Sequence, residues 1–393
     1  MLYVITSDTP AYQHSPELQL AFRMFKKAMP VGIILEVITV EEGDDEERAF
    51  RDRLSAMLEA TKTDDYILIV RQSWIFLGQN TIAILSELLN ESPGIDCVLP
   101  SDMRHYRSAA GVIDYHTLRG FERFVERLQN EDEPVMEYDG RDPFIFMVRG
   151  RVLQETPLPD NVFSLPQGFP DRTAIALNAY AHEPVNYYGE SRPEIVEMIP
   201  ASVRSLLDIG CARGGFGSLL KSTRDCYVTG LELNPSQSAE AEKVLDRVIQ
   251  GDALKAQIDK PVDCVTALDS LEHFTDPESL LNKIHQEFLT PGGYLVISIP
   301  NVGHWSIVED LLAGRWDYVP IGLLCNTHFR FFTFSSIKEL VQDCGFRVLE
   351  VSQLSTPLPK NMNEAVGLLV EKGMAIDRDN LEVVNYHIVA QAI

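Results

Sequence analysis

Short apolar runs alternate with amphipathic stretches along most of the chain. In the first 155 residues the strand-like runs LYVITS, GIILEVITV, DYILIV and DCVLP are separated by helical stretches at 16–28, 46–60 and 81–89. A further helical stretch at 117–129 precedes the apolar run FIFMV at 144–148. Strands that alternate with helices are typical of a mainly parallel sheet covered by helices. Residues 1–155 are therefore predicted to form an α/β domain.

A proline-rich segment interrupts this alternation at 156–171. The sequence TPLPDNVFSLPQGFPD carries prolines at four positions, and each disfavours helix at the residue before it. The alternation then restarts, with the strand-like runs SLLDI, CYVTGLEL, RVIQ, DCVTAL, GYLVISIP and FRVLEVSQL and a last one near 382–392. We therefore predict a linker at 156–171 and a second α/β domain at 172–393.

Charge and composition narrow the classes of partner. The chain has 34 basic and 58 acidic side chains, a formal net charge of -24, which disfavours binding to nucleic acid and to anionic membrane surfaces. No apolar run approaches the ~20 residues that span a bilayer, so no membrane insertion is expected. The six cysteines are scattered without a CxxC pair, which is typical of reduced thiols and predicts a cytoplasmic protein. The sequence leaves open whether the protein forms a homodimer.

A glycine-rich turn, LLDIGCARGGFG at 206–217, joins a buried strand to a helix. Such turns let the backbone approach a ligand, but a nicotinamide-dinucleotide site has a similar shape. The acidic residues favour another ligand: Asp208 lies inside the turn motif, Glu232 ends the next strand, and Asp252 follows the third. Asp208 would repel a pyrophosphate, whereas three carboxylates suit the ammonium, ribose and adenine groups of an amino-acid nucleoside.

These residues resemble the class I S-adenosylmethionine-dependent methyltransferase family. Gly210, Gly214 and Gly217 match its loop, while Ala212 replaces a frequent glycine. The resemblance implies a Rossmann-like C-terminal sheet of seven strands with the last one antiparallel. It also implies S-adenosylmethionine as cofactor and S-adenosylhomocysteine as product. The cofactor-binding residues that it implies are Asp208, Gly210, Cys211, Gly214, Glu232, Leu233, Asp252, Ala253, Asp269, Tyr188 and Arg192.

The segment ALDSLEHFTDP at 267–277 resembles the LEH segment of small-molecule O-methyltransferases, including the ubiquinone-biosynthesis enzymes. A neutral hydroxyl is a weak nucleophile, so methyl transfer to oxygen calls for a nearby base. His273 is the favoured base, with Glu272 and His328 as further catalytic candidates. The alternative is that Glu272 and His273 start or cap a helix and bond to the backbone. No metal is expected, although Asp269, Glu272 and His273 match magnesium-binding positions of some relatives.

A long insertion at 300–336 resembles a bacterial subfamily found in cell-surface polysaccharide gene sets, through the patterns LLxGRWxY, GLL and THxRFFT. The pair Cys325–Asn326 departs from that pattern. Side chains suited to a saccharide are His304, Trp305, Trp316, Tyr318, His328 and Arg330. Phe329, Phe331 and Phe332 are predicted to fill the core. The expected acceptor is a small molecule or saccharide, methylated on a hydroxyl of a sugar or glycan precursor.

The order of elements in residues 1–155 resembles the nucleotide-sugar-binding fold of family-two glycosyltransferases, although a flavodoxin-like domain would show a similar order. After the DYILIV strand the chain has Arg71-Gln72-Ser73-Trp74 where an active transferase carries an Asp-x-Asp metal motif. The first domain is therefore expected to be a degenerate transferase fold without sugar-transfer activity. A bifunctional glycosyltransferase-methyltransferase and a non-catalytic cofactor-binding scaffold remain alternatives.

Overall fold

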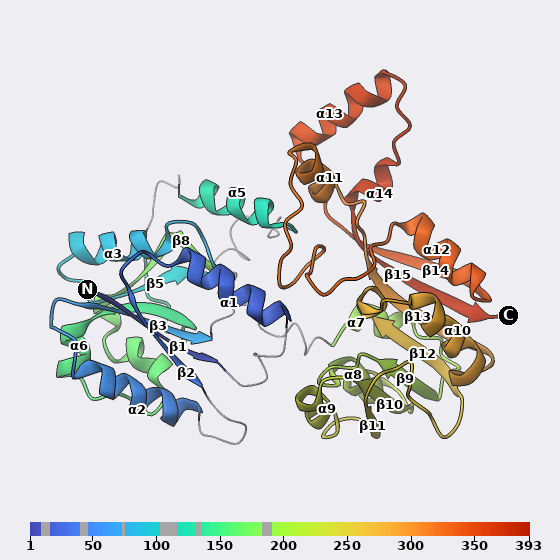
Figure 1. The fold of residues 1–393 in the computed structure, drawn as a ribbon, viewed down its shortest axis with the longest axis horizontal. Coiled ribbons are helices and arrows are strands. Elements are labelled where there is room, and N and C mark those ends of the chain that lie inside the picture. The colour runs from blue at the N-terminus through green and yellow to red at the C-terminus, as the bar shows by residue number, and fades with distance from the viewer. Residues whose placement is uncertain (9–15, 40–45, 73–74, 103–115, 130–134, 183–190) are drawn as a thin grey trace. The chain divides into compact units, whose positions relative to one another are not determined.

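The computed structural model describes the chain except for residues 9–15, 40–45, 73–74, 103–115, 130–134 and 183–190 (Figure 1). Its contacts divide the chain into two compact units. Met1–Pro184 and Asp317–Asn326 form the first unit, and Val185–Trp316 and Thr327–Ile393 form the second. Among the described residues no helix has the length and apolar character needed to cross a membrane. All six cysteines are among the described residues; they are buried and form no disulfide.

The first unit has helices and strands close to the predicted positions. Its named elements are β1 (Leu2–Asp8), α1 (Pro16–Ala28), β2 (Ile34–Thr39), α2 (Glu46–Leu58), β3 (Tyr66–Gln72), β4 (Phe76–Leu77), α3 (Thr81–Glu91), β5 (Cys97–Ser101), α5 (Leu118–Leu128), β6 (Val135–Glu137), β7 (Ile145–Arg149), α6 (Gly150–Glu155) and β8 (Thr173–His182).

The sheet of the first unit is mixed, and the prediction of a mainly parallel sheet is wrong. Its strands follow the order β2-β1-β3-β7-β5-β8-β4, with β6 paired to β8. The pairs β1–β2, β1–β3 and β5–β8 are parallel, whereas β3–β7, β5–β7, β4–β8 and β6–β8 are antiparallel. The FIFMV run enters the centre of the sheet as β7, against the direction of both neighbours. An apolar pattern records burial but not strand direction, which explains the difference.

The proline-rich segment packs into the first unit instead of linking two domains. It forms 3₁₀ turns at Val162–Gly168 and Pro170–Arg172, and its apolar side chains join the core, where Phe163 contacts the ring of Phe50 edge to face at 5.3 Å. The chain then enters the first sheet as β8. The prolines exclude a long helix, but the apolar residues between them anchor the segment in the first unit. The division between the two units therefore falls after Pro184 and not at the predicted linker 156–171.

The second unit is a separate α/β sandwich. Its elements are α7 (Pro193–Met198), β9 (Ser205–Ile209), α8 (Gly215–Thr223), β10 (Tyr227–Glu232), α9 (Pro235–Ala241), β11 (Arg247–Gln250), β12 (Val262–Leu268), α10 (Pro277–Lys283), β13 (Leu289–Pro300), α11 (Trp305–Leu312), α12 (Phe334–Asp343), β14 (Phe346–Ser355), α13 (Lys360–Glu371), α14 (Arg378–Glu382) and β15 (Val383–Ala392).

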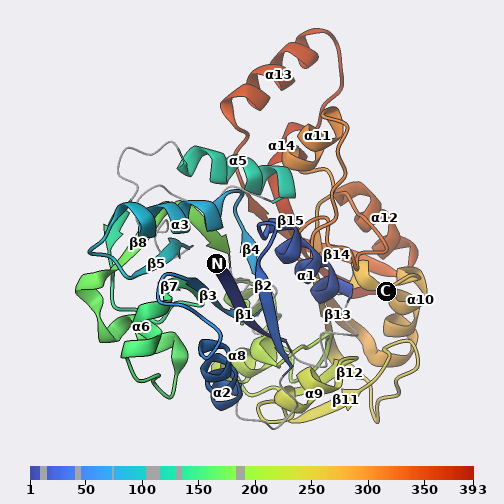
Figure 2. The same ribbon diagram turned by 60° about the vertical axis from the view of Figure 1, so that its left-hand side comes forward.

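The seven strands of this unit lie in the order β11-β10-β9-β12-β13-β15-β14. Strand β15 runs antiparallel to both of its neighbours, while the pairs from β11 to β13 are parallel. Helices α7, α8 and α9 cover one face of the sheet and α10 and α12 the other (Figures 1 and 2). This Rossmann-like sheet confirms the predicted fold of the second half. The strand order reverses between β9 and β12, where ligands bind in open α/β sheets.

Candidate functional site

The glycine-rich turn leaves the carboxyl end of β9 and enters α8. Gly210 and Gly214 adopt positive φ angles of 74° and 81°, and Ala212 adopts a φ of 47°, in the left-handed region that favours glycine. A Cβ added to Gly210 would lie 2.4 Å from Oγ of Ser270, so only glycine fits there. Gly214 directly precedes α8 as its N-cap residue. Backbone shape therefore explains Gly210 and Gly214 among the glycines that the sequence singled out.

Asp208 is buried at the end of β9, where it accepts a hydrogen bond of 2.7 Å from the Thr266 hydroxyl. Loss of water raises the pKa of this carboxyl to about 7, and the negative charge of Glu232 adds to the rise, although the Thr266 hydroxyl opposes it. A buried carboxyl with such a raised pKa is the kind of group found at functional sites.

Glu232 ends β10 and accepts two backbone hydrogen bonds, from the N–H of Ala212 at 2.9 Å and that of Asn234 at 2.8 Å. It therefore ties the glycine-rich turn to the start of α9. Asp252 follows β11; the backbone N–H of Leu254 and the ammonium of Lys255 lower the pKa of its carboxyl. Because β9, β10 and β11 are neighbours in the sheet, the three carboxylates lie at successive strand ends along one edge.

The remaining predicted cofactor residues take several environments. Cys211 and Ala253 are buried, whereas Leu233 is 69% exposed beside Glu232. Arg192 and Asp269 bind each other rather than facing open space. Tyr188 lies outside the described residues.

Asp269 follows β12 with a positive φ of 47° and is surrounded by donors. Besides Arg192, it accepts hydrogen bonds from Ser298 at 2.6 Å and from the side-chain amide of Asn385 at 2.7 Å. Burial alone would raise the pKa of Asp269, but the Arg192 charge and these hydrogen bonds outweigh it and lower the pKa. Asn385 comes from β15, more than a hundred residues later in the chain, and no local pattern marks it as a partner.

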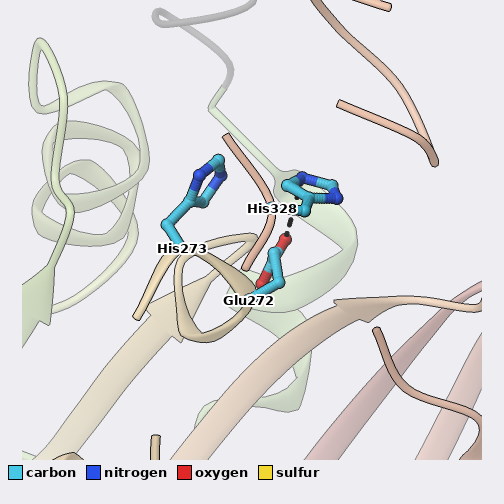
Figure 3. A group of neighbouring side chains, drawn as sticks. All are labelled: Glu272, His273 and His328. Carbon is cyan, nitrogen blue, oxygen red and sulfur yellow. Dashed lines mark ion pairs between the residues drawn. The ribbon is translucent and has the colours of Figure 1, made fainter. Parts of the chain in front are cut away.

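Glu272, His273 and His328 form a compact cluster beside this network (Figure 3). One candidate ligand atom from each residue lies within 4.8 Å of the others, and Nε2 of His328 is 3.9 Å from a Glu272 oxygen. The rings of His273 and His328 meet edge to face, with centroids 4.8 Å apart. The sequence proposed these three residues as catalytic candidates, and the fold brings them together. It does not bring Asp269 into the cluster, which changes the metal-ligand set that the sequence suggested.

Glu272 and His273 do not cap a helix. They lie in a 3₁₀ turn at Leu271–His273, and the side chain of Asp276 caps α10 by accepting a hydrogen bond from the backbone N–H of Ser279. Burial raises the pKa of the Glu272 carboxyl well above its usual range, and the charge of Asp269 raises it further. The predicted capping role is therefore wrong, whereas the contact of His273 Nδ1 with the Thr327 carbonyl agrees with the backbone bonding that this alternative also predicted.

The insertion contributes fewer saccharide-type side chains than predicted. His304 is fully buried and bonded to Ser306 and Thr356, and Trp305 packs in a small core with α13. Phe332 is buried as predicted, but Phe329 is 56% exposed. Arg330, next to Phe329, is also exposed. A sequence pattern could not separate these roles, because aromatic residues serve both cores and binding surfaces.

Several known methyltransferases are similar to part of this chain. Residues 180–351 match a family of methyltransferase domains. The ubiquinone biosynthesis O-methyltransferase of Pseudomonas putida is 27% identical over 178 residues, covering 42% of this chain and 75% of the relative. An O-methyltransferase of Penicillium expansum is 24% identical over 243 residues, covering 56% and 83%. A methyltransferase structure from Archaeoglobus fulgidus aligns with a TM-score of 0.38 at 21% identity, covering 52% and 96%.

The second unit thus contains a class I methyltransferase domain. The protein is an S-adenosylmethionine-dependent methyltransferase, with relatives among the O-methyltransferases. The nicotinamide-dinucleotide alternative is set aside.

Proposed function

We propose that the second unit transfers a methyl group from S-adenosylmethionine to a hydroxyl oxygen of a small acceptor, and that this acceptor is a sugar or glycan precursor. One observation carries the site assignment. Ser270, two residues before Glu272, donates a hydrogen bond of 3.0 Å to the carbonyl of Ile209, directly before the glycine-rich turn. The cluster of Glu272, His273 and His328 therefore lies beside the turn that receives the cofactor.

The cofactor carboxylates have distinct proposed roles. Asp208 pairs with the ammonium of the methionine part, Glu232 accepts hydrogen bonds from the ribose hydroxyls, and Asp252 faces the adenine amino group. The exposed side chain of Leu233 offers an apolar surface to the adenine ring. Arg192 and Asp269 support the methionine end through their mutual ion pair.

The chemistry needs little from the protein at the methyl group, because the sulfonium is itself activated. The acceptor oxygen attacks the methyl carbon in line with the breaking carbon–sulfur bond. The protein accelerates this reaction chiefly by holding the acceptor oxygen and the methyl carbon close together. His273 is the proposed base. Its Nδ1 lies 3.2 Å from the carbonyl oxygen of Thr327, which can only accept a hydrogen bond. In the neutral imidazole Nδ1 therefore carries the proton, and Nε2 is the basic nitrogen.

Two observations support the acceptor class. The matched relatives named above are O-methyltransferases. Phe329 and Arg330, both exposed, follow His328 directly and offer an aromatic face and a guanidinium, which suit a sugar ring and its hydroxyls. These features favour a polar hydroxylated acceptor.

The test is a screen of the full chain with methyl-labelled S-adenosylmethionine against sugars, nucleotide sugars and phenolic acceptors. Mass spectrometry should find a gain of one methyl on a hydroxyl of a saccharide acceptor. Methylation restricted to phenols would contradict the saccharide class. Tight binding of S-adenosylhomocysteine without methylation of any hydroxyl would favour the non-catalytic scaffold.

For the first unit we propose a transferase-like fold that does not transfer sugars. Transfer from a nucleotide sugar generally needs the departing diphosphate neutralised, often by a carboxylate-held divalent ion. Arg71 follows the apolar part of β3 where such a carboxylate would stand, and its guanidinium lies 4.5 Å from the ring centre of Phe163. The full chain should therefore show no hydrolysis of nucleotide sugars in the presence of manganese, and saturable hydrolysis would overturn this proposal.

A further inference from the structure

Strand β15 contacts both members of the ion pair between Arg192 and Asp269. The side-chain amide of Asn385 donates a hydrogen bond of 2.7 Å to Asp269. Two residues further along the strand, Nε2 of His387 lies 3.4 Å from Nη2 of Arg192. Alternate residues of a strand face the same side of its sheet, so one face of β15 carries both contacts.

The orientation of the Asn385 amide is fixed by a second partner. Its Oδ1 accepts a hydrogen bond of 3.1 Å from the backbone N–H of Ile299 at the end of β13. A backbone N–H can only donate, so the amide oxygen faces Ile299 and the NH₂ group faces Asp269. The side chain of Asn385 therefore offers a preset donor to this carboxylate.

The backbone at both ends of the ion pair lies in the left-handed region. Arg192 and Asp269 each have a φ of 47°. Residues other than glycine seldom adopt this conformation, and it persists where the surrounding contacts enforce it. At Asp269 these contacts include the Asn385 amide and the hydrogen bond of 3.1 Å from the backbone N–H of Asp269 to the carbonyl of Ser298. The surrounding residues therefore set the position of the pair.

The ion pair lies beside the glycine-rich turn and is only partly covered. Ser270, the residue after Asp269, donates to the carbonyl of Ile209 directly before that turn. The side chains of Arg192 and Asp269 are 16% and 27% exposed, whereas His387 behind them is buried. The exposed part of the pair is therefore open to a ligand bound at the turn.

We propose that Asn385 is a positioning residue that holds this ion pair for the amino-acid end of S-adenosylmethionine. The inference rests on the proposed function in one respect, the placement of the methionine part of the cofactor beside the pair. The amino-acid end of the cofactor is a zwitterion, and the pair presents one charge of each sign to it. A binding group contributes most when its own supporting contacts lock it in place.

The test compares two ligands that differ at the amino-acid end. S-adenosylhomocysteine carries this end, whereas methylthioadenosine keeps the nucleoside and the sulfur but lacks the amino acid. In calorimetry of the full chain, Asn385→Ala should weaken S-adenosylhomocysteine binding about tenfold and change methylthioadenosine binding by less than about twofold. The matched control Asn363→Ala, at an exposed asparagine of α13, should change neither affinity. Equal losses for both ligands, or an unchanged affinity for S-adenosylhomocysteine, would overturn the proposal.

A second variant guards against a simple loss of packing. Asn385→Asp has almost the same shape and keeps an oxygen for the backbone N–H of Ile299. It places a second carboxylate against Asp269 instead of a donor, so it should weaken S-adenosylhomocysteine binding at least as much as Asn385→Ala. Binding as tight as in the unchanged protein would contradict the role of the NH₂ group.

A double-mutant cycle tests whether Asn385 acts through Asp269. Asp269→Ala should itself weaken S-adenosylhomocysteine binding. Adding Asn385→Ala should then change the affinity by less than about twofold, because the amide no longer has a carboxylate to hold. Independent losses that multiply in the double mutant would contradict a role through Asp269.

These measurements separate the inference from the proposed function. Unchanged S-adenosylhomocysteine affinity in Asp269→Ala would contradict the placement of the ion pair at the methionine end, and the inference with it. A loss in Asp269→Ala without one in Asn385→Ala would overturn the role of Asn385 alone. The selective loss in Asn385→Ala, found in a protein that methylates no saccharide hydroxyl, would support the role of Asn385 and contradict the proposed acceptor.

Discussion

Replacing Asp208 by Asn should stabilise the cofactor-free protein while weakening its binding of the cofactor. The pKa of this carboxyl is raised from 3.8 to about 7, mainly because burial removes its water. The folded state therefore holds the proton more tightly than the unfolded chain does. The carboxyl costs no stability below about pH 4, and its full penalty is present above about pH 7, since ionisation is then complete in both states.

The penalty can be bounded from these values. A rise from 3.8 to about 7 corresponds to about 4 kcal/mol at ~1.4 kcal/mol per pH unit, an upper limit for a relaxed protein. Asparagine removes the charge but keeps an oxygen that can accept the 2.7 Å hydrogen bond from Thr266. The variant should gain about 1 to 4 kcal/mol at pH 8 and clearly less at pH 5.

The assay is denaturant unfolding of the full chain at the two pH values, following the transition of the second unit, with and without S-adenosylhomocysteine. The matched control is Asp225→Asn, at an exposed carboxyl just before β10. It should change neither the free energy of unfolding nor the stabilisation by S-adenosylhomocysteine. The product should stabilise the unchanged protein but not Asp208→Asn, because the neutral amide cannot pair with an ammonium. A variant destabilised equally at both pH values, or one with unchanged product affinity, would refute this reasoning.

Three further outcomes are expected. Glu232→Ala should weaken S-adenosylhomocysteine binding at least tenfold in calorimetry, or by about 1.4 kcal/mol. The reason is that the ribose hydroxyls and the glycine-rich turn both lose a hydrogen-bond acceptor. The control variant Glu240→Gln, at an exposed carboxylate, should bind S-adenosylhomocysteine normally. Gly210→Ala should destabilise the second unit by about 1 to 3 kcal/mol in thermal unfolding. In the double mutant, Ser270→Ala should relieve part of the clash with the new Cβ. If the destabilisations of the two single variants simply add in the double mutant, the proposed clash is contradicted. His273→Ala should lower turnover about a hundredfold or more with nearly intact cofactor affinity, and preserved specific activity would remove His273 from the reaction.

The elements of the fold were largely readable from the sequence, but the arrangement of the first sheet was not. Apolar periodicity placed β9 at Ser205–Ile209 and α1 at Pro16–Ala28 with their observed bounds. It could not give the antiparallel direction of β7. It also misread the segment before β8, because prolines mark where helices stop and not whether the side chains between them are buried.

The residues of the proposed cofactor site could be selected from the sequence because their pattern is local. Asp208 lies near the end of β9, Glu232 ends β10 and Asp252 follows β11. Parallel strands bring their carboxyl ends to one edge, so the order of the elements in the chain predicted that these carboxylates lie along that edge. The glycine-rich turn is also a local feature, because the residues that shape it are neighbours in the sequence.

The sequence by itself determined the methyltransferase fold of the second half and the class of cofactor. The tertiary structure decided which of these side chains meet across long separations in the chain. It placed His328 beside Glu272 and assigned Asp269 to Arg192 and Asn385. The physical reason is that hydrogen bonds and burial depend on the tertiary structure. A buried carboxylate binds the donors that pack against it, and these donors cannot be identified from their distance along the sequence.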